Sequence, residues 1–308
     1  MVADLGNAWS ASAGLDFGKG VVWAADATQG WHGGTSLTEW VRDAEEAQAA
    51  VAALAGHCRR VRVMPFLEGI PCSIHGIVCA DGVVALRPVE MVVLRRGREF
   101  VYCGAGTYWD PPDGVREEMR AVARRVGQQL AAEVDFRGAF TVDGVVTVDG
   151  FRPTELNPRS GAGLNTIARG IPGFPLSEVL DLIVSGRGIS RTAAELEAQL
   201  LDSADGSRHG GTWTMDPTID VDVPQRSVWF TGSGWSETAK AGRGIGTALG
   251  PVPGALVIGG AGFLRCTFTD WPIGSSIAPA AAAFYDWADR ELGTGLGPLT
   301  PAPEVTSG

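Results

Sequence analysis

The sequence is almost without lysine. Of its 25 basic residues only Lys19 and Lys240 are lysine, and 35 acidic residues leave a formal net charge of −10. A negative chain disfavours nonspecific binding to nucleic acid or to an anionic membrane surface, so we expect neither as a partner. Because arginine supplies nearly all the other positive charge, the two lysines are candidates for a specific role, although most lysines lie on protein surfaces.

Long apolar runs and cysteine pairs are also missing. No stretch approaches the roughly 20 apolar residues that a membrane span requires, and the first residues lack the basic and apolar regions of a signal peptide. We therefore expect a cytoplasmic protein. An odd number of cysteines without any CxxC pair argues against a disulfide framework or a structural zinc site. We expect buried, reduced thiols at Cys58, Cys72, Cys79, Cys103 and Cys266.

What is present suits a globular α+β protein. With 308 residues and 45% hydrophobic composition, the chain can form one large or two ordinary domains. Apolar residues at helical spacing predict helices at residues 41–56 and 115–134, and strands joined at the turn Asp81-Gly82 lie between them. Further on, the sequence is glycine-rich with short strands and closes with a predicted helix at residues 279–292.

An acid and an amide stand two residues apart in the stretch TELNPR, residues 154–159. On a strand, Glu155 and Asn157 would point to the same face. Arg159 follows directly, and a run of small residues comes after it. An exposed strand face would also explain this composition.

The dipeptide Asp149-Gly150 predicts that this strand pairs with the preceding one in a hairpin. A three-residue loop centred on Asp149 would place Asp143 opposite Glu155. A strict two-residue turn would place Asp143 opposite Leu156 instead. The first register brings two carboxylates and an amide together.

Two carboxylates at such a distance repel each other unless a cation lies between them. An all-oxygen set of this kind is what Mg²⁺ prefers when phosphate oxygens and water complete its shell. Arg159 could then bind the same phosphates as a planar fork. Spacing alone leaves open both this metal-phosphate site and a solvated strand edge.

The stretch TELNPRSGAGLN resembles the E-x-N-P-R signature of the ATP-grasp superfamily. Other segments are similar in the right order: GLDFGKGV to the glycine-rich loop over the ATP phosphates, and VRVMPFLEGIPCSIHGIV to the hinge strand whose backbone meets adenine. FRGAFTVDGVVTVDGFRPTELNPR resembles the metal-binding hairpin and is the most specific of the matches. The resemblance covers roughly residues 14–185.

This resemblance implies an ATP-grasp fold, curtailed at its N-terminus, with a C-terminal β-rich subdomain. The corresponding domain division is a partial N-lobe with the glycine-rich loop at 1–60, a C-lobe with the metal-binding hairpin at 61–190, a β-rich subdomain at 191–292, and a disordered tail at 293–308. A Walker A phosphate loop is rejected, because Ala13 and Gly20 stand where that motif requires a glycine and a hydroxyl residue.

The resemblance also implies a set of site residues. Mg²⁺, or Mn²⁺, would be held by Asp143, Glu155 and Asn157. The catalytic residues would be Arg159, on the transferring phosphate, and Lys19, near the β and γ phosphates. The residues that bind ATP would be Gly14, Gly18, Lys19, Gly20, Met64, Pro65, Phe66, Leu67 and Arg159.

The implied function is an ATP- and Mg²⁺-dependent ligase that joins a small-molecule carboxylate to an amine through an acyl phosphate. Relatives place a separate domain, and a further lysine, before the glycine-rich loop, whereas here only about a dozen residues precede it. A partner or a second copy in a homo-oligomer would then supply that part. The alternative is a noncatalytic remnant that binds nucleotide or a partner protein.

Other polar and aromatic residues carry weaker signals. We interpret His75 as a hydrogen-bonded structural histidine rather than a ribose contact, and Ser73 shares its strand parity. Trp109 either lines a substrate pocket or packs at a turn. We expect His32 and Lys240 on the surface.

Overall fold

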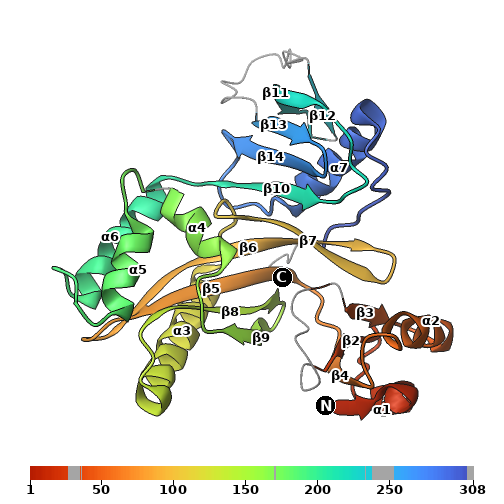
Figure 1. Ribbon diagram of the computed structural model, residues 1–308, viewed down its shortest axis with the longest axis horizontal. Helices are drawn as coiled ribbons and strands as arrows, with labels where there is room; N and C mark the ends of the chain where they lie inside the picture. The colour runs from red at the N-terminus through yellow and green to blue at the C-terminus, as the bar shows by residue number, and fades with distance from the viewer. Residues whose placement is uncertain (27–34, 36, 170, 233, 238–252, 304–308) are drawn as a thin grey trace.

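The computed structural model describes residues 1–26, 35, 37–169, 171–232, 234–237 and 253–303 (Figure 1). In this part of the chain the strands form one branched, 14-stranded sheet, and all of its paired strands run antiparallel. Helices pack on both faces, so the α+β class is confirmed. None of the helices in the described ranges combines the length and hydropathy that crossing a bilayer requires.

The N-terminal lobe is a small sheet backed by short helices. Its elements are β1 (Val2–Asp4), the 3-10 helix η1 (Leu5–Asn7), α1 (Ala8–Ser12), β2 (Val21–Ala25), β3 (Thr38–Val41), α2 (Ala44–Leu54) and β4 (Arg60–Pro65). Asp43 begins α2 by accepting a hydrogen bond from the Glu46 amide (2.9 Å). Since β4 pairs with both β1 and β2, this lobe extends to Pro65, beyond the boundary predicted at residue 60.

The central part consists of long strands, with one long helix on one face and three shorter helices on the other. Its elements are β5 (Ile70–Val78), β6 (Val83–Arg96), β7 (Glu99–Gly106), α3 (Asp113–Val134), β8 (Gly138–Thr147), β9 (Gly150–Asn157), α4 (Ala162–Arg169), α5 (Leu176–Val184) and α6 (Ala193–Gly206). One edge of β7 is shared by β3 and β10, so the small N-terminal sheet and the C-terminal strands join the central sheet at the same strand.

The C-terminal part continues the sheet. It contains β10 (Gly210–Met215), β11 (Val223–Phe230), β12 (Trp235–Ser236), β13 (Gly254–Gly260), β14 (Phe263–Thr269) and α7 (Ala278–Leu292). The predicted β-rich character is therefore present. Its start at residue 191 was placed too early, because Leu196, Leu200 and Ala204 of α6 pack in the same core as β5 and β6.

The predicted disordered tail is wrong for residues 293–303, which are ordered. Asp289 accepts hydrogen bonds from the amides of Leu296 and Gly297 (both 2.8 Å), and Thr300 forms a β-bridge with Arg95. Leu296 is buried in the core under α7. A composition rich in glycine and proline does not reveal these tertiary contacts, which outweigh the entropy of ordering the segment. Residues 304–308 lie outside the described part of the chain.

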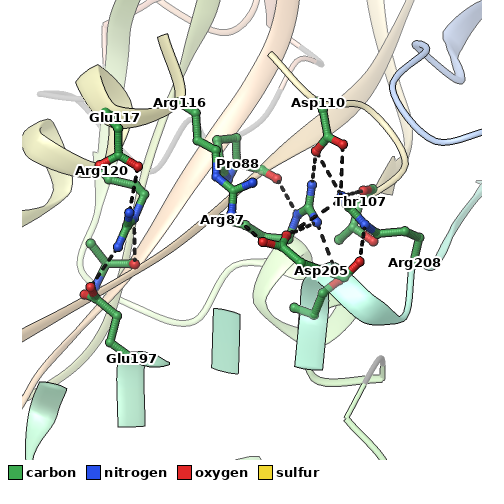
Figure 2. A network of polar contacts seen from close by, with 12 residues as sticks. Arg87, Pro88, Thr107, Asp110, Arg116, Glu117, Arg120, Glu197, Asp205 and Arg208 are labelled. Carbon is green, nitrogen blue, oxygen red and sulfur yellow. Dashed lines mark hydrogen bonds and ion pairs between the residues drawn. The ribbon is translucent and has the colours of Figure 1, made fainter. Parts of the chain in front are cut away.

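A charged network joins α6 to the strands beneath it (Figure 2). Arg87 of β6 is fully buried, yet its guanidinium donates to Asp110 and to Asp205, each at 2.5 Å. Arg116 of α3 also donates to Asp205 (2.6 Å), and Arg208 donates to both carboxylate oxygens of Asp110. A buried guanidinium requires such partners because an unpaired charge away from water is very unfavourable.

The same helix carries a second ion-pair group. Glu197 accepts hydrogen bonds from Arg120 (2.8 Å) and Arg124 (2.6 Å), and its other oxygen accepts from the amide of Ala85 (2.6 Å). Charge therefore fixes α6 against α3 and β6 at two places. Short contacts that are mostly shielded from water make this arrangement specific in geometry.

We expect Asp205→Ala to lower the free energy of unfolding by about 3 kcal/mol. This value is at the low end for breaking a buried ion pair, because Arg87 would still be paired with Asp110. Urea denaturation measures this. Glu99→Ala is the control: it breaks an exposed pair with Arg96, and a change of at most about 1 kcal/mol is expected. Equal effects of the two substitutions would show that the buried network does not stabilise the fold.

Candidate functional site

The hairpin β8–β9 has the register that brings the carboxylates together. Asp143 pairs with Glu155, as predicted. The route differs from the predicted three-residue loop: Thr147 pairs with Gly150 across a two-residue loop, and an extra residue at Thr154 shifts the pairing by one. The loop and this bulge together produce the offset that a three-residue loop would have produced.

Asn157 lies next to the acid pair. Its amide Nδ2 donates to Asp143 Oδ2 (3.0 Å), which leaves the amide oxygen available to a ligand. Burial, followed by the negative charge of Glu155, raises the pKa of Asp143 to about 6, while Arg159 and the Asn157 hydrogen bond oppose that rise. The structure therefore brings together Asp143, Glu155, Asn157 and Arg159, and Arg159 keeps an exposed side chain.

The donor set fits a hard divalent cation. It offers two carboxylates and an amide oxygen on one strand pair. Burial and Glu155 disfavour the ionised form of Asp143, and a bound cation would stabilise that form. The described residues contain no group of three or more His, Cys, Asp or Glu side chains placed to hold a metal. A metal here would thus depend on Asn157, water and phosphate for its remaining ligands.

His75 is a structural residue, as interpreted from the sequence. It is fully buried, and its ring nitrogens contact Thr141 Oγ1 (2.9 Å) and Ser73 Oγ (3.2 Å). Burial lowers the pKa of His75 to about 3, so the ring is neutral near pH 7. Ser73 is also buried and pairs with Asp143 on the neighbouring strand.

The small residues after the hairpin permit close packing on this histidine. A Cβ on Gly163 would lie 2.3 Å from His75 Nε2, and one on Gly161 would lie 2.7 Å from Thr141 Oγ1. Glycine is therefore required here because the start of α4 meets the sheet without space for a side chain. This contact fixes the segment that follows Arg159.

The glycine-rich turn before β2 is closed by its own aspartate. Gly18 and Gly20 have positive φ angles, and both amides donate to Asp16 Oδ1, at 2.7 Å and 2.9 Å. A carboxylate of the chain thus occupies the concavity that could otherwise bind an anion. Gly14 lies before this turn, and a Cβ added to it would meet no other atom within 4 Å.

Lys19 contacts the hinge segment rather than the hairpin. Its Nζ lies 3.1 Å from Glu68 Oε2, and both side chains are about half exposed. It has no ion pair with Asp143 or Glu155 among the described contacts. In the structure the Lys19 ammonium therefore pairs with the residue that follows the expected adenine segment.

Most of the hinge backbone already has partners. Met64 and Pro65 pair with β2, and the Phe66 amide donates to Gly20 O (3.3 Å). The Phe66 ring stacks on Trp40 at 4.4 Å between centroids. Within the described ranges the Leu67 backbone has no hydrogen bond, and the Phe66 carbonyl has none either.

The other residues singled out in the sequence are Trp109, His32 and Lys240, and none of them belongs to the hairpin. Trp109 is 4% exposed and packs in the core under α3. It also borders a cavity of about 530 Å³ whose lining includes Val146 of β8 but neither Asp143 nor Glu155. His32 and Lys240 lie outside the described residues.

One pair of residues near the site had no signal in the sequence. Tyr102 of β7 and Trp213 of β10 contact each other edge to face, with ring centroids 5.8 Å apart. The two are over 100 positions apart in the chain, and only the pairing of β10 with β7 brings them together. No local spacing rule could have found them.

Comparison with known proteins finds similarity in structure but not in sequence. No protein-family model matches the chain, and no curated protein matches it in sequence. The biotin carboxylase domain of the Hydrogenobacter thermophilus 2-oxoglutarate carboxylase, solved with MgADP, ADP and bicarbonate, matches with a TM-score of 0.54 and 13% identity over 97% of this chain. This chain covers 61% of the chain in that structure, less than two thirds of its length.

A second solved structure agrees. The N5-carboxyaminoimidazole synthase of Aspergillus clavatus, solved with ADP and 5-aminoimidazole ribonucleotide, matches with a TM-score of 0.53 and 12% identity over 94% of this chain and 68% of that chain. At such identities both matches concern the fold alone.

We expect Gly163→Ala to lower the free energy of unfolding by about 1–3 kcal/mol, because the new methyl group overpacks against the buried His75 ring. The control is Gly114→Ala in the first turn of α3. Its Cβ would meet nothing within 4 Å, so the better helix propensity of alanine should raise stability by about 0.5–1 kcal/mol. Urea denaturation of both variants measures the contrast, and a stabilised Gly163→Ala protein would contradict the packing described above.

We expect Glu155→Gln to raise the free energy of unfolding in EDTA by about 0.2–1 kcal/mol, because it removes a like charge directly opposite Asp143. Glu133→Gln, on the exposed face of α3, is the matched control and should change little. Chemical denaturation at pH 8, where Asp143 is ionised, measures both. A less stable Glu155→Gln protein would mean that Glu155 is a structural partner rather than a repelling charge.

Proposed function

Because the chain has the ATP-grasp fold, which ATP-dependent ligases and carboxylases share, we propose that it is an ATP- and Mg²⁺-dependent ligase that joins a carboxylate to an amine. The observation that carries the proposal is the pairing of Asp143 with Glu155 beside Asn157. This arrangement is unfavourable without a cation and suits Mg²⁺ when phosphate oxygens complete its shell.

The reaction proposed has two steps. An oxygen of the carboxylate substrate attacks the γ-phosphorus of ATP, a P–O bond forms, and the bond to the β-phosphate oxygen breaks to release ADP. The amine then attacks the acyl carbon, a C–N bond forms, and phosphate leaves as the amine loses its proton. When bound, Mg²⁺ would offset negative charge on the phosphate oxygens.

The residues of the chain contribute position and charge. Asp143 and Glu155 hold the metal-phosphate group at the hairpin, and the Asn157 amide oxygen completes the protein's share. Arg159, exposed beside them, is proposed to bind the transferring phosphoryl group and stabilise the charge that develops on it. Leu67 is the proposed adenine contact, because both its backbone amide and its carbonyl are without a hydrogen bond in the described part of the hinge.

A specific observation supports a second candidate function. The amides of Gly18 and Gly20 donate to Asp16, and Lys19 pairs with Glu68, so these groups are occupied within the chain. A protein that binds nucleotide at the hairpin without transferring phosphate would need only Asp143, Glu155, Asn157 and Arg159. This is the noncatalytic alternative.

We expect Glu155→Gln and Asp143→Asn to weaken MgADP binding by at least about tenfold, since even the loss of an outer partner of a metal ligand typically costs 10–100-fold. Isothermal titration calorimetry with MgADP measures this. Asp149→Asn is the matched control, because it removes a carboxylate at the exposed tip of the same hairpin and should leave binding unchanged.

The catalytic part is measured separately as ADP formed from MgATP in mixtures of carboxylates and amines. ADP that forms only when both are present, and that disappears in Arg159→Ala, supports the ligase. Binding that is sensitive to Glu155→Gln but gives no ADP supports the noncatalytic candidate. If the wild type does not bind MgADP, or if Glu155→Gln binds it equally well, the hairpin is not a metal-phosphate site.

A further inference from the structure

The face of the sheet that carries the hairpin acids also carries a row of residues that the helices cover only in part. We call this row, which includes Met91, Val93 and Tyr102, the strip. Asp143 pairs with Ser73, and Ser73 pairs with Val89, so the three side chains point to one face. Along β6 the same face continues with Met91 and Val93, which are half-buried, whereas the residues between them are buried on the opposite face.

Tyr102 belongs to this strip. It pairs with Val93, so its ring lies on the face of the hairpin acids, and it is 36% exposed. Burial raises the pKa of Tyr102 to about 12, and the negative charge of Asp143 adds to that rise. The phenol is therefore within electrostatic reach of the proposed metal-phosphate site.

Trp213 extends the strip onto the next strand. Its ring meets Tyr102 at an interplanar angle of 86°, and it packs partly against the core under α4 to α6. The two rings together form a half-exposed aromatic corner, which we call the Tyr102–Trp213 pair. Such a corner can receive a third flat apolar group in stacked or edge-to-face contact.

Charge around the pair selects among possible ligands. Trp213 pairs across β10 and β14 with Arg265, a half-buried residue that forms no ion pair within the described part of the chain. An aromatic pair can also attract a cation, but a guanidinium beside it opposes that. On the Trp213 side of the pair, the guanidinium of Arg265 therefore favours a neutral or anionic aromatic group over a cationic one.

We propose that the Tyr102–Trp213 pair is the acceptor subsite of the ligase and that the carboxylate substrate carries an aromatic or similarly flat apolar group. This inference rests on the proposed function, since the hairpin would place the γ-phosphate next to the strip. The acceptor carboxylate lies toward Asp143 and Arg159, and its aromatic part lies in the corner. Tyr102 and Trp213 then determine substrate specificity without taking part in bond making.

The test uses the full chain labelled with 5-fluorotryptophan, with the ¹⁹F resonance of Trp213 assigned from Trp213→Phe. The probes are phenylacetate and acetate, which differ by the ring alone. We expect phenylacetate to shift the Trp213 resonance in a saturable manner and acetate to leave it in place. The resonance of Trp9, an exposed residue of α1, is the internal control and should not move with either probe.

Variants of Tyr102 separate ring contact from other effects. Tyr102→Ala should raise the dissociation constant for phenylacetate about two- to tenfold, as expected for one aromatic contact. Tyr102→Phe keeps the ring and should bind like the wild type. Urea denaturation of each variant checks that the fold is intact.

The outcomes keep this proposal and the ligase proposal apart. If MgADP binds but phenylacetate does not shift Trp213, or shifts Trp9 equally, the acceptor subsite is wrong and the metal-phosphate site stands. If phenylacetate shifts Trp213 but MgADP does not bind, the corner is an aromatic binding site and its role in a ligase reaction is overturned. Faster ADP formation with phenylacetate than with acetate, lost in Tyr102→Ala, is the expected result for the complete proposal.

Discussion

Two carboxylates that face each other across neighbouring strands are the constraint around which the site is built. Repulsion between directly opposed charges costs about 0.2–1 kcal/mol, whereas burial of each large apolar side chain contributes about 1.5–3 kcal/mol. On β8, Phe140, Val142 and Val146 are buried in the core shared with α3. A slip of one residue would turn them to the opposite face. Packing on that face therefore holds Asp143 opposite Glu155 although their charges oppose the arrangement.

Support for the other face comes from residues that carry no charge. His75 is neutral and buried, and the glycines at the start of α4 pack directly against it, so the segment after Arg159 has a fixed starting point. The ion pairs that hold α6 lie on α3, β6 and the residues next to them. The acids of the α6 network have arginine partners, whereas Asp143 and Glu155 face each other at the hairpin, as expected where local strain serves a site.

Sequence reasoning succeeded where the signal was local. The Asp149-Gly150 hairpin and the long helix before it follow from patterns within a few turns of chain. The register of Asp143 does not, because it depends on the bulge at Thr154. Contacts distant in sequence could not be predicted: the ordered tail depends on Asp289 and on a bridge to Arg95, and Arg87 finds its partners on a loop and on α6. The glycine-rich turn shows a further limit, because the same glycines suit a phosphate loop or a turn closed by Asp16, and only the geometry distinguishes them.

The balance of charge at the hairpin bears on the order in which ligands would bind. Asp143 and Glu155 are negative, Lys19 is paired with Glu68, and Arg159 is the cation beside the acids in the described structure. A nucleoside diphosphate without a bound metal would add further negative charge to this site and would be repelled. If the hairpin binds phosphate, the metal must therefore arrive with the nucleotide or before it. A site that obtains its positive charge from a divalent cation and from Arg159 does not need a lysine ammonium group. This agrees with the scarcity of lysine in the sequence.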